Sequence, residues 1–250
     1  MKVLITAGGT CEDIDSVRSI TNHSTGRLGS IIADKFAHEN ATVTYVCGEK
    51  AALPSSENIE IIRIRNVEGL QQALDELLER HLFDCVIHSM AVSDFTPLAV
   101  LTVDDIVKSL QALDISDSTQ EELSDKIYSA VTASAKPLNK SKISSRHSDL
   151  MILLRQTPKI IKGIKAKQPS TILVGFKLLV DVSKDELLQT AKDFLTQNSC
   201  DFVLANDLQN IHNDSHKAIL VDINSVVHKA STKQEIATTI YSAVSERINK

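Results

Sequence analysis

The sequence predicts an α/β protein built on a doubly wound, mostly parallel, Rossmann-like sheet. Short apolar runs rich in β-branched residues alternate with amphipathic stretches along almost the whole chain. Strands that alternate with helices are joined by right-handed crossovers and form a parallel sheet covered on both faces. Of the 250 residues, 42% are hydrophobic and 24% are charged, enough for a substantial core. We therefore expect a single α/β domain over residues 1–250.

The predicted strands are short apolar runs that cover residues 2–6, 41–46, 59–64, 84–88, 150–154, 171–176 and 201–205. Helices are predicted between them, over residues 27–38, 67–80 and 184–197. In the helix over 67–80, Leu70, Leu74 and Leu77 recur at helical spacing and define a buried face. Near the C-terminus, residues 217–221 and 225–229 predict an antiparallel hairpin, and a last helix begins near Thr232.

A long segment between Asp94 and Lys142 breaks this alternation. We expect helices over 103–113 and from about residue 118, where Ser118 and Glu121 have the spacing of a capping box. No strand is predicted there. A helical insertion at about 96–140 is expected to be a lid or a dimer arm, because its apolar helix faces need a cover, with a flexible solvated insert as the alternative.

Composition excludes several classes of function. The net charge of −5 disfavours a nucleic-acid partner. No apolar run approaches the roughly 20 residues of a membrane span, so no membrane association is expected. The cysteines are scattered, which disfavours structural zinc and a disulfide framework and favours the reducing cytoplasm. No cluster of histidines and acids identifies metal ligands.

The loop after the first strand carries the strongest functional pattern. Gly8 and Gly9 follow an apolar run, and Ser24, Thr25 and Gly26 precede the helix over 27–38. Glycines allow close approach of a ligand to the main chain, and the N–H groups at a helix start favour an anion. Alternatively, the pattern is a plain glycine turn followed by a Ser or Thr N-cap. We prefer a phosphate site, because both motifs are joined by a polar loop.

Polar residues also follow other predicted strands, where open α/β sheets bind ligands. Asp94 follows the strand over 84–88, and Asn206 follows the strand over 201–205. Lys142 could stabilise phosphoryl charge, and Phe176 could flank a base. Three of them also have a plain structural interpretation: Asp94 as a capping or turn aspartate, Lys142 as a solvated lysine and Phe176 as a core phenylalanine.

These residues resemble those of the phosphopantothenoylcysteine synthetases, or phosphopantothenate–cysteine ligases. The matching positions in the opening loop are Gly8, Gly9, Thr10, Glu12, Ile14, Asp15, Val17, Arg18, Ile20, Thr21, Asn22, Ser24 and Gly26. Further matches, in the family's order, are Ala91 to Phe95, Lys142-Ile143, Thr157-Pro158, Gly175-Phe176 and Ala205-Asn206-Asp207. The likeness is to the stand-alone bacterial form, without a fused flavin-dependent decarboxylase.

The resemblance implies that 4′-phosphopantothenate and cysteine are joined through an acyl-nucleotide made from a nucleoside triphosphate, CTP more than ATP, with Mg²⁺. It implies a homodimer in the cytoplasm and a role in coenzyme A biosynthesis. The implied catalytic residues are Asn22, which orients the acyl group, and Lys142, which stabilises charge. The residues implied to bind nucleotide are Gly8, Gly9, Thr10, Ser24, Thr25, Gly26, Ala91, Asp94, Phe176 and Asn206. Arg18, Asn22 and Ala91 are implied to bind substrate.

The chain departs from the family's pattern at the positions that are expected to bind the triphosphate. Fused bacterial members carry lysines on the helix before the Ala-Asn-Asp strand, where Phe194 and Asn198 stand here. Lys177, Lys184 or Lys192 would have to compensate, so the choice between CTP and ATP stays open. An NAD(P)-dependent oxidoreductase is the second hypothesis, although Gly-x-Gly-x-x-Gly does not follow the first strand. A non-catalytic nucleotide-binding protein is the third.

Overall fold

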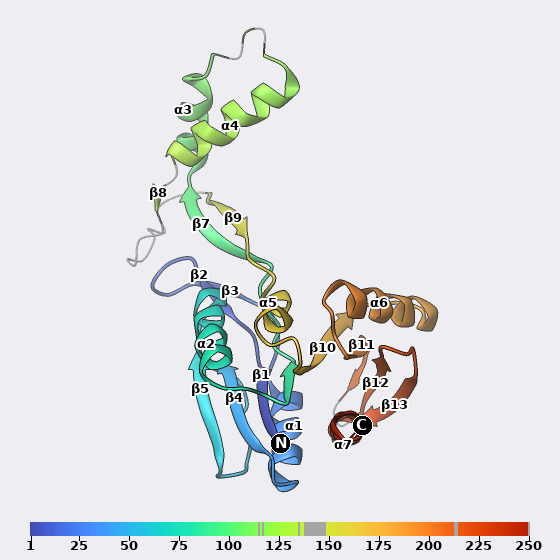
Figure 1. The fold of residues 1–250 in the computed structure, drawn as a ribbon. Coiled ribbons are helices and arrows are strands. Elements are labelled where there is room, and N and C mark those ends of the chain that lie inside the picture. Colours follow the sequence, from blue (N-terminus) through green and yellow to red (C-terminus); the bar gives the residue numbers. More distant parts are fainter. Residues whose placement is uncertain (115, 117, 135, 138–148, 213–214, 250) are drawn as a thin grey trace. The chain divides into compact units, whose positions relative to one another are not determined.

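The computed structural model describes residues 1–114, 116, 118–134, 136–137, 149–212 and 215–249, which form two compact units (Figure 1). Unit 1 comprises Met1–Thr10, Asn22–Val92 and Lys159–Lys250, and unit 2 comprises Cys11–Thr21 and Ser93–Pro158. All of the predicted parallel sheet except the strand over 150–154 belongs to unit 1.

In the described residues, unit 1 contains an eight-stranded sheet with the order β13-β12-β11-β10-β6-β1-β4-β5. Its strands are β1 (Lys2–Ala7), β4 (Thr42–Gly48), β5 (Ile59–Ile64), β6 (Cys85–His88), β10 (Ile172–Leu179), β11 (Phe202–His212), β12 (Ser215–Asp222) and β13 (Val227–Thr232). From β5 to β11 neighbouring strands are parallel, whereas β12 and β13 are antiparallel. The predicted doubly wound Rossmann-like class with a C-terminal hairpin is confirmed.

Helices cover both faces of this sheet: α1 (Arg27–His38), α2 (Val67–Arg80), α5 (Ile160–Lys167), α6 (Lys184–Gln197) and α7 (Lys233–Ile248). On one face, α1 and α7 bury Ile32, Ile236 and their apolar neighbours in a common core. The ring of Phe36 in α1 meets the ring of Tyr241 in α7 edge-on, with centroids 5.3 Å apart. On the other face, α2, α5 and α6 bury a second core. The three helices predicted over 27–38, 67–80 and 184–197 have these bounds.

Unit 2 contains a hairpin, a small sheet and two helices among its described residues. The hairpin pairs β2 (Cys11–Asp13) with β3 (Ser19–Thr21). The sheet has the order β8-β7-β9, with β7 (Phe95–Leu101) between β8 (Lys136–Pro137) and β9 (Met151–Gln156). The helices are α3 (Val103–Gln111) and α4 (Gln120–Ser134). The opening loop is thus partly a hairpin, which we did not predict.

The prediction that no strand lies between Asp94 and Lys142 is wrong, because β7 and β8 lie there. Proline usually excludes a central strand, since it lacks an N–H. Here β7 advances two residues from Pro97 to Ala99 where β9 advances one, so a bulge accommodates the proline. The strand predicted over 150–154 forms as β9 but pairs with β7, outside the large sheet.

The predicted capping box of the insertion is displaced by one residue. The Glu122 side chain accepts from the backbone N–H and hydroxyl of Thr119, and the Glu122 N–H donates to that hydroxyl. Thr119 and Glu122, rather than Ser118 and Glu121, therefore start α4. An equivalent box that we did not predict starts α3, between Thr102 and Asp105.

Candidate functional site

The sheet has its topological switch point between β1 and β6. After β1 the chain continues to β4 and β5 on one side, and after β6 it continues to β10 and β11 on the other. The connections that follow the two strands therefore lead to opposite sides of the sheet, and open α/β sheets hold ligands at such a point. The loop that begins at Gly8 and the segment around Ala91 leave the sheet at this point.

Hydrogen bonds join these two segments. The Ala91 N–H donates to the Gly8 carbonyl at 2.8 Å, and the Thr10 N–H donates to the Ala91 carbonyl at 3.2 Å. The Asn22 amide nitrogen donates to the Val92 carbonyl at 3.3 Å. The structure thus brings together the predicted residues Gly8, Gly9, Thr10, Asn22 and Ala91 in unit 1.

Glycine, not serine or threonine, caps α1. Gly26 is the N-cap in the left-handed region (φ 72°, ψ 0°), so the alternative interpretation of a Ser or Thr N-cap is wrong. The Thr25 hydroxyl, one position earlier, accepts from the Arg27 N–H at 3.4 Å. Gly8 also has a positive φ, of 82°. A Cβ on Gly26 would lie 2.9 Å from Ala51 Cβ and 3.1 Å from the Gly8 nitrogen. Only glycine fits this packing, and the amide end of α1 stands beside the glycine turn.

Ser24 and Thr25 lie just before this cap. The Ser24 N–H donates to the Asn22 carbonyl at 2.9 Å, and the Thr25 carbonyl accepts from the Ala52 N–H at 2.9 Å. These main-chain bonds fix the loop and leave Thr25 exposed. Ser24 and Thr25 thus place two hydroxyl groups directly before the start of α1.

A cluster of polar residues joins β1 to β6 next to the switch point. The Thr6 hydroxyl lies 2.9 Å from Nδ1 of His88, and the Ser89 hydroxyl donates to the Thr6 carbonyl at 2.6 Å. Burial lowers the pKa of His88 to about 4. A neutral imidazole is therefore part of the scaffold that joins β1 to β6.

Phe176 and Asn206 lie on the sheet face that α1 and α7 cover. Phe176 packs against the core of that face. Asn206 alternates with Leu204 along β11, so its side chain projects to the same face. The expectation that Asn206 ends its strand is wrong: β11 runs on to His212, and a register shift follows Asn206.

Sequence reasoning missed a partner of Asn206. The Asn206 amide lies 3.1 Å from Nε2 of His216 in β12, and both side chains are buried. Burial, reinforced by Lys233, lowers the pKa of His216 to about 4. Nδ1 of His216 has no hydrogen-bond partner within the described ranges. Its place on the same strand face as Ala218 and Leu220 was the available signal, because a histidine on an apolar face needs a partner.

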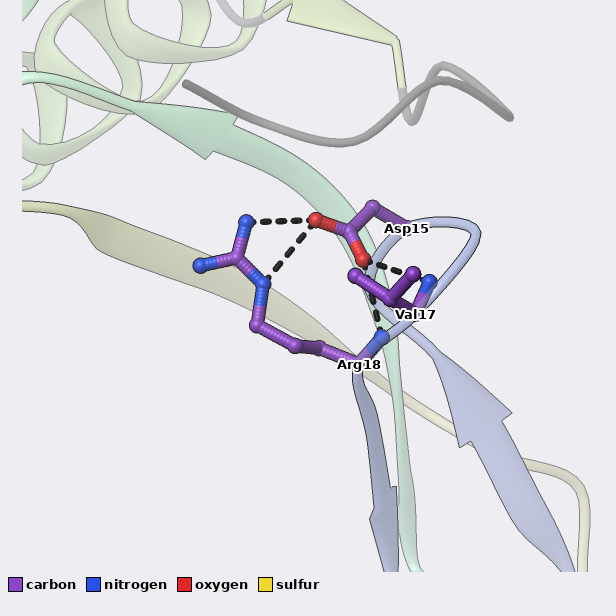
Figure 2. A network of polar contacts seen from close by, with 3 residues as sticks. All are labelled: Asp15, Val17 and Arg18. Atoms are coloured by element: carbon purple, nitrogen blue, oxygen red, sulfur yellow. Dashed lines mark hydrogen bonds and ion pairs between the residues drawn. The ribbon is translucent and has the colours of Figure 1, made fainter. Parts of the chain in front are cut away.

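Three predicted site residues do not belong to the described part of unit 1. Arg18 and Asp94 belong to unit 2, where Asp94 is exposed and its carbonyl accepts from the Thr157 N–H at 2.9 Å. Arg18 is bound by Asp15, as Figure 2 shows. Lys142 lies outside the described residues.

Of the lysines considered for the triphosphate, Lys177 has a specific contact. Its ammonium lies over the Phe194 ring, 5.7 Å from the centroid. A Cβ on Gly175 would lie 2.9 Å from the same ring, so the glycine makes room for it. The ring of Phe194 therefore contacts both Gly175 and the ammonium of Lys177, two residues further along β10.

No cage of protein ligands for a metal ion is apparent in the described ranges, which hold no suitable group of three His, Cys, Asp or Glu side chains. Mg²⁺ commonly keeps several waters and binds through substrate phosphates, so a site built on amide donors and hydroxyls is compatible with it. None of the helices described is long and apolar enough to cross a membrane.

The doubly wound sheet, with its glycine turn and helix start at the switch point, defines a Rossmann-like α/β protein. Residues 1–125 and 105–248 match the family described as the DNA/pantothenate metabolism flavoprotein C-terminal domain, and the chain belongs to this family.

The comparisons with known proteins extend over the whole chain. The crystal structure of the DNA/pantothenate metabolism flavoprotein from Streptococcus pneumoniae is 38% identical, with a TM-score of 0.80 and 99% of each chain covered. The coenzyme A biosynthesis bifunctional protein CoaBC of Thermococcus kodakarensis is 28% identical over 99% of this chain and 51% of its own length. A Cab2 variant in complex with phosphopantothenate-cysteine shares the fold, with a TM-score of 0.67 and 17% identity over 98% of this chain and 86% of its own. The chain spans about half the length of the curated relatives it matches first.

Proposed function

We propose that the chain is a phosphopantothenate–cysteine ligase, which makes 4′-phosphopantothenoylcysteine in coenzyme A biosynthesis. The junction between the glycine loop and the segment after β6 carries the proposal, because it fixes Asn22 next to the glycine loop, whose N–H groups would bind phosphates. Family membership supports it, as do a relative named for coenzyme A biosynthesis and a related fold that binds phosphopantothenate-cysteine.

In the first step, a carboxylate oxygen of phosphopantothenate attacks the α-phosphorus of the nucleoside triphosphate. A new P–O bond forms, the bond to the leaving oxygen breaks, and pyrophosphate departs. Such reactions need positioning and charge stabilisation more than covalent help from the protein. Gly8, Gly9, Thr10, Ser24, Thr25 and Gly26 would hold phosphates, and Lys142 would stabilise the developing charge. Mg²⁺ bound to the triphosphate would neutralise phosphoryl charge.

In the second step, the amine of cysteine attacks the acyl carbon, the amide forms, and the nucleoside monophosphate leaves. Asn22 would orient the acyl group in both steps. Its bond to the Val92 carbonyl fixes the direction of the amide, and Ala91 lies in the same junction. A positioned amide with limited rotation suits a reaction whose second nucleophile arrives later.

The nucleotide is proposed to be CTP, with the base near Ala91, Asp94, Phe176 and Asn206. Lys177 is proposed to bind the triphosphate in place of the missing helix lysines. Its ammonium lies over Phe194 and keeps a positive charge on β10, on the opposite sheet face from the neighbouring Phe176. The use of free cysteine and CTP would place the reaction in the cytoplasm.

Unit 2 is proposed to pair with a second copy of the chain, as an arm rather than a lid. Its helices expose apolar side chains, among them Val103 at 48% and Tyr128 at 57%. Replacement of both with lysine should convert a dimer to a monomer in sedimentation analysis. A wild-type monomer at high concentration would overturn this part of the proposal.

The function is tested with purified protein, phosphopantothenate, cysteine, Mg²⁺ and either CTP or ATP. We expect phosphopantothenoylcysteine and one pyrophosphate per product. Without cysteine, acyl-nucleotide and pyrophosphate should form but no amide. Absence of product with both nucleotides would refute the proposal.

A further inference from the structure

The turn of the β2–β3 hairpin is built around one carboxylate. The Asp15 side chain is 0% exposed. Its Oδ1 accepts from the backbone N–H groups of Val17 and Arg18, at 2.9 and 2.8 Å. The N–H groups of Ile14 and Asp15 donate to the Arg18 carbonyl, at 2.9 and 3.2 Å. Figure 2 shows the carboxylate inside the turn.

The second oxygen of the same carboxylate binds a side chain. Nε and Nη2 of Arg18 donate to Oδ2 of Asp15, at 3.0 and 2.5 Å. This is a charge-assisted pair in which one edge of the guanidinium is held. The Arg18 side chain remains 43% exposed. One buried residue therefore fixes both the backbone and the guanidinium of Arg18.

The charge of Asp15 exceeds what the turn requires. A neutral asparagine oxygen can accept the same two backbone N–H groups. Burial of a carboxylate is costly unless a partner compensates it, and Arg18 is one such partner. A long arginine side chain also has many rotamers, which the pair with Asp15 restricts. The arrangement therefore orients a cation at the tip of the hairpin.

We infer that Asp15 is a positioning residue that orients Arg18 to bind an anionic group of phosphopantothenate. The inference rests on the proposed function and adds a residue to it. Asp15 acts through Arg18 and does not contact the substrate. A guanidinium held at one edge is matched to a phosphate or carboxylate, whose geometry suits a planar fork.

The test separates the two tasks of Asp15. Asp15→Asn keeps an oxygen for the turn, but its NH₂ group cannot accept from Arg18. We expect the KM for phosphopantothenate to rise about tenfold, the loss typical of one charge-assisted hydrogen bond. The KM values for CTP and cysteine should stay within about twofold, and Arg18→Gln should give the same pattern. The double variant should be no worse than either single one, because both remove one interaction.

Asp13→Asn is the matched control, because it removes the same charge from an exposed position of the same hairpin. It should leave all three KM values unchanged. If Asp15→Asn does not fold, Asp15→Ser retains a hydroxyl acceptor for the turn and serves the same test. A rise in the KM for CTP instead, or no rise for phosphopantothenate, would overturn the inference.

A second measurement does not depend on activity. Hydrogen exchange at Nε of Arg18, followed by NMR, should be slow in the wild type and at least tenfold faster in Asp15→Asn. An inactive wild type with a protected Nε–H would refute the proposed function. An active wild type whose Arg18 Nε–H exchanges freely would refute the role of Asp15 alone.

Discussion

The amide nitrogen of Asn22 donates to the main-chain carbonyl of Val92, 3.3 Å away and 70 positions later in the sequence. Through this bond the end of the opening loop is attached to the segment that leaves β6. The two halves of the candidate site are thereby held in one arrangement within unit 1.

Substitution Asn22→Asp is expected to impair the second chemical step more than the first. A carboxylate cannot donate to the Val92 carbonyl, and its charge repels that oxygen. Amide formation should fall about 100-fold and pyrophosphate release less than about tenfold. Rapid-quench measurement of acyl-nucleotide and product separates the steps. Asn40→Asp, at an exposed left-handed position that tolerates aspartate, is the control. Equal losses in both steps would contradict the assigned role.

Substitution Lys142→Gln is expected to abolish acyl-nucleotide formation. Loss of a cation that stabilises phosphoryl charge typically costs about 100-fold or more in rate. Exchange of labelled pyrophosphate into CTP, measured without cysteine, reports this step alone. Lys140→Gln, two positions away, should retain full exchange. Normal exchange in the Lys142 variant would exclude the lysine from the first step.

Substitution Gly26→Ala is expected to lower the free energy of unfolding by about 1–3 kcal/mol, because the N-cap has φ 72° and no room for a Cβ. Nucleotide binding should weaken at the same time. In contrast, Gly163→Ala in α5 meets nothing within 4 Å and should stabilise the helix by up to about 1 kcal/mol. Urea denaturation and calorimetric titration with CTP measure both effects. An unchanged Gly26→Ala variant would show that the cap can relax.

His88 is expected to make the protein less stable as the pH falls. Its pKa is lowered from 6.5 to about 4 in the folded state, so the unfolded chain binds more protons between these values. The contribution is fully present above about pH 6.5 and is lost as the pH falls to about 4. It amounts to about 3 kcal/mol at most. His216 has the same shift, to about 4, and acts in the same window.

The measurement is urea denaturation at pH 7 and pH 5, for the wild type, His88→Asn, His216→Asn and the double variant. Each single variant should reduce the dependence of the unfolding free energy on pH, and the double variant should reduce it further. If all four proteins had the same dependence, neither histidine would be buried in its neutral form.

Periodicity was sufficient to predict the main body of the fold. Strands and amphipathic helices each have a characteristic spacing of apolar residues, which is visible in the sequence. The helices Val67–Arg80 and Lys184–Gln197 have the predicted bounds. Strand β7 could not be predicted, because Pro97 disfavours a strand. The bulge that accommodates the proline is visible only in the structure. The β2–β3 hairpin was missed because its turn depends on the Asp15 side chain, not on glycine.

The candidate site was predictable only in part. Glycines and polar residues after β1 and β6 pointed to the junction that the structure contains. Contacts across strands, such as Asn206 with His216, depend on register and face, and no spacing in the sequence reports them. The unexpected glycine cap arose because Ala51 packs against Gly26, a contact between positions 25 apart in the chain.

The packing of α1 against α7 has a consequence for biosynthesis. Helix α1, with Phe36, is synthesised well before Tyr241 of α7, on which Phe36 packs. During translation the apolar face of α1 that contacts α7 therefore stays exposed until residues 233–248 have been synthesised. A nascent chain arrested before them should bind chaperones and aggregate more readily than the finished protein.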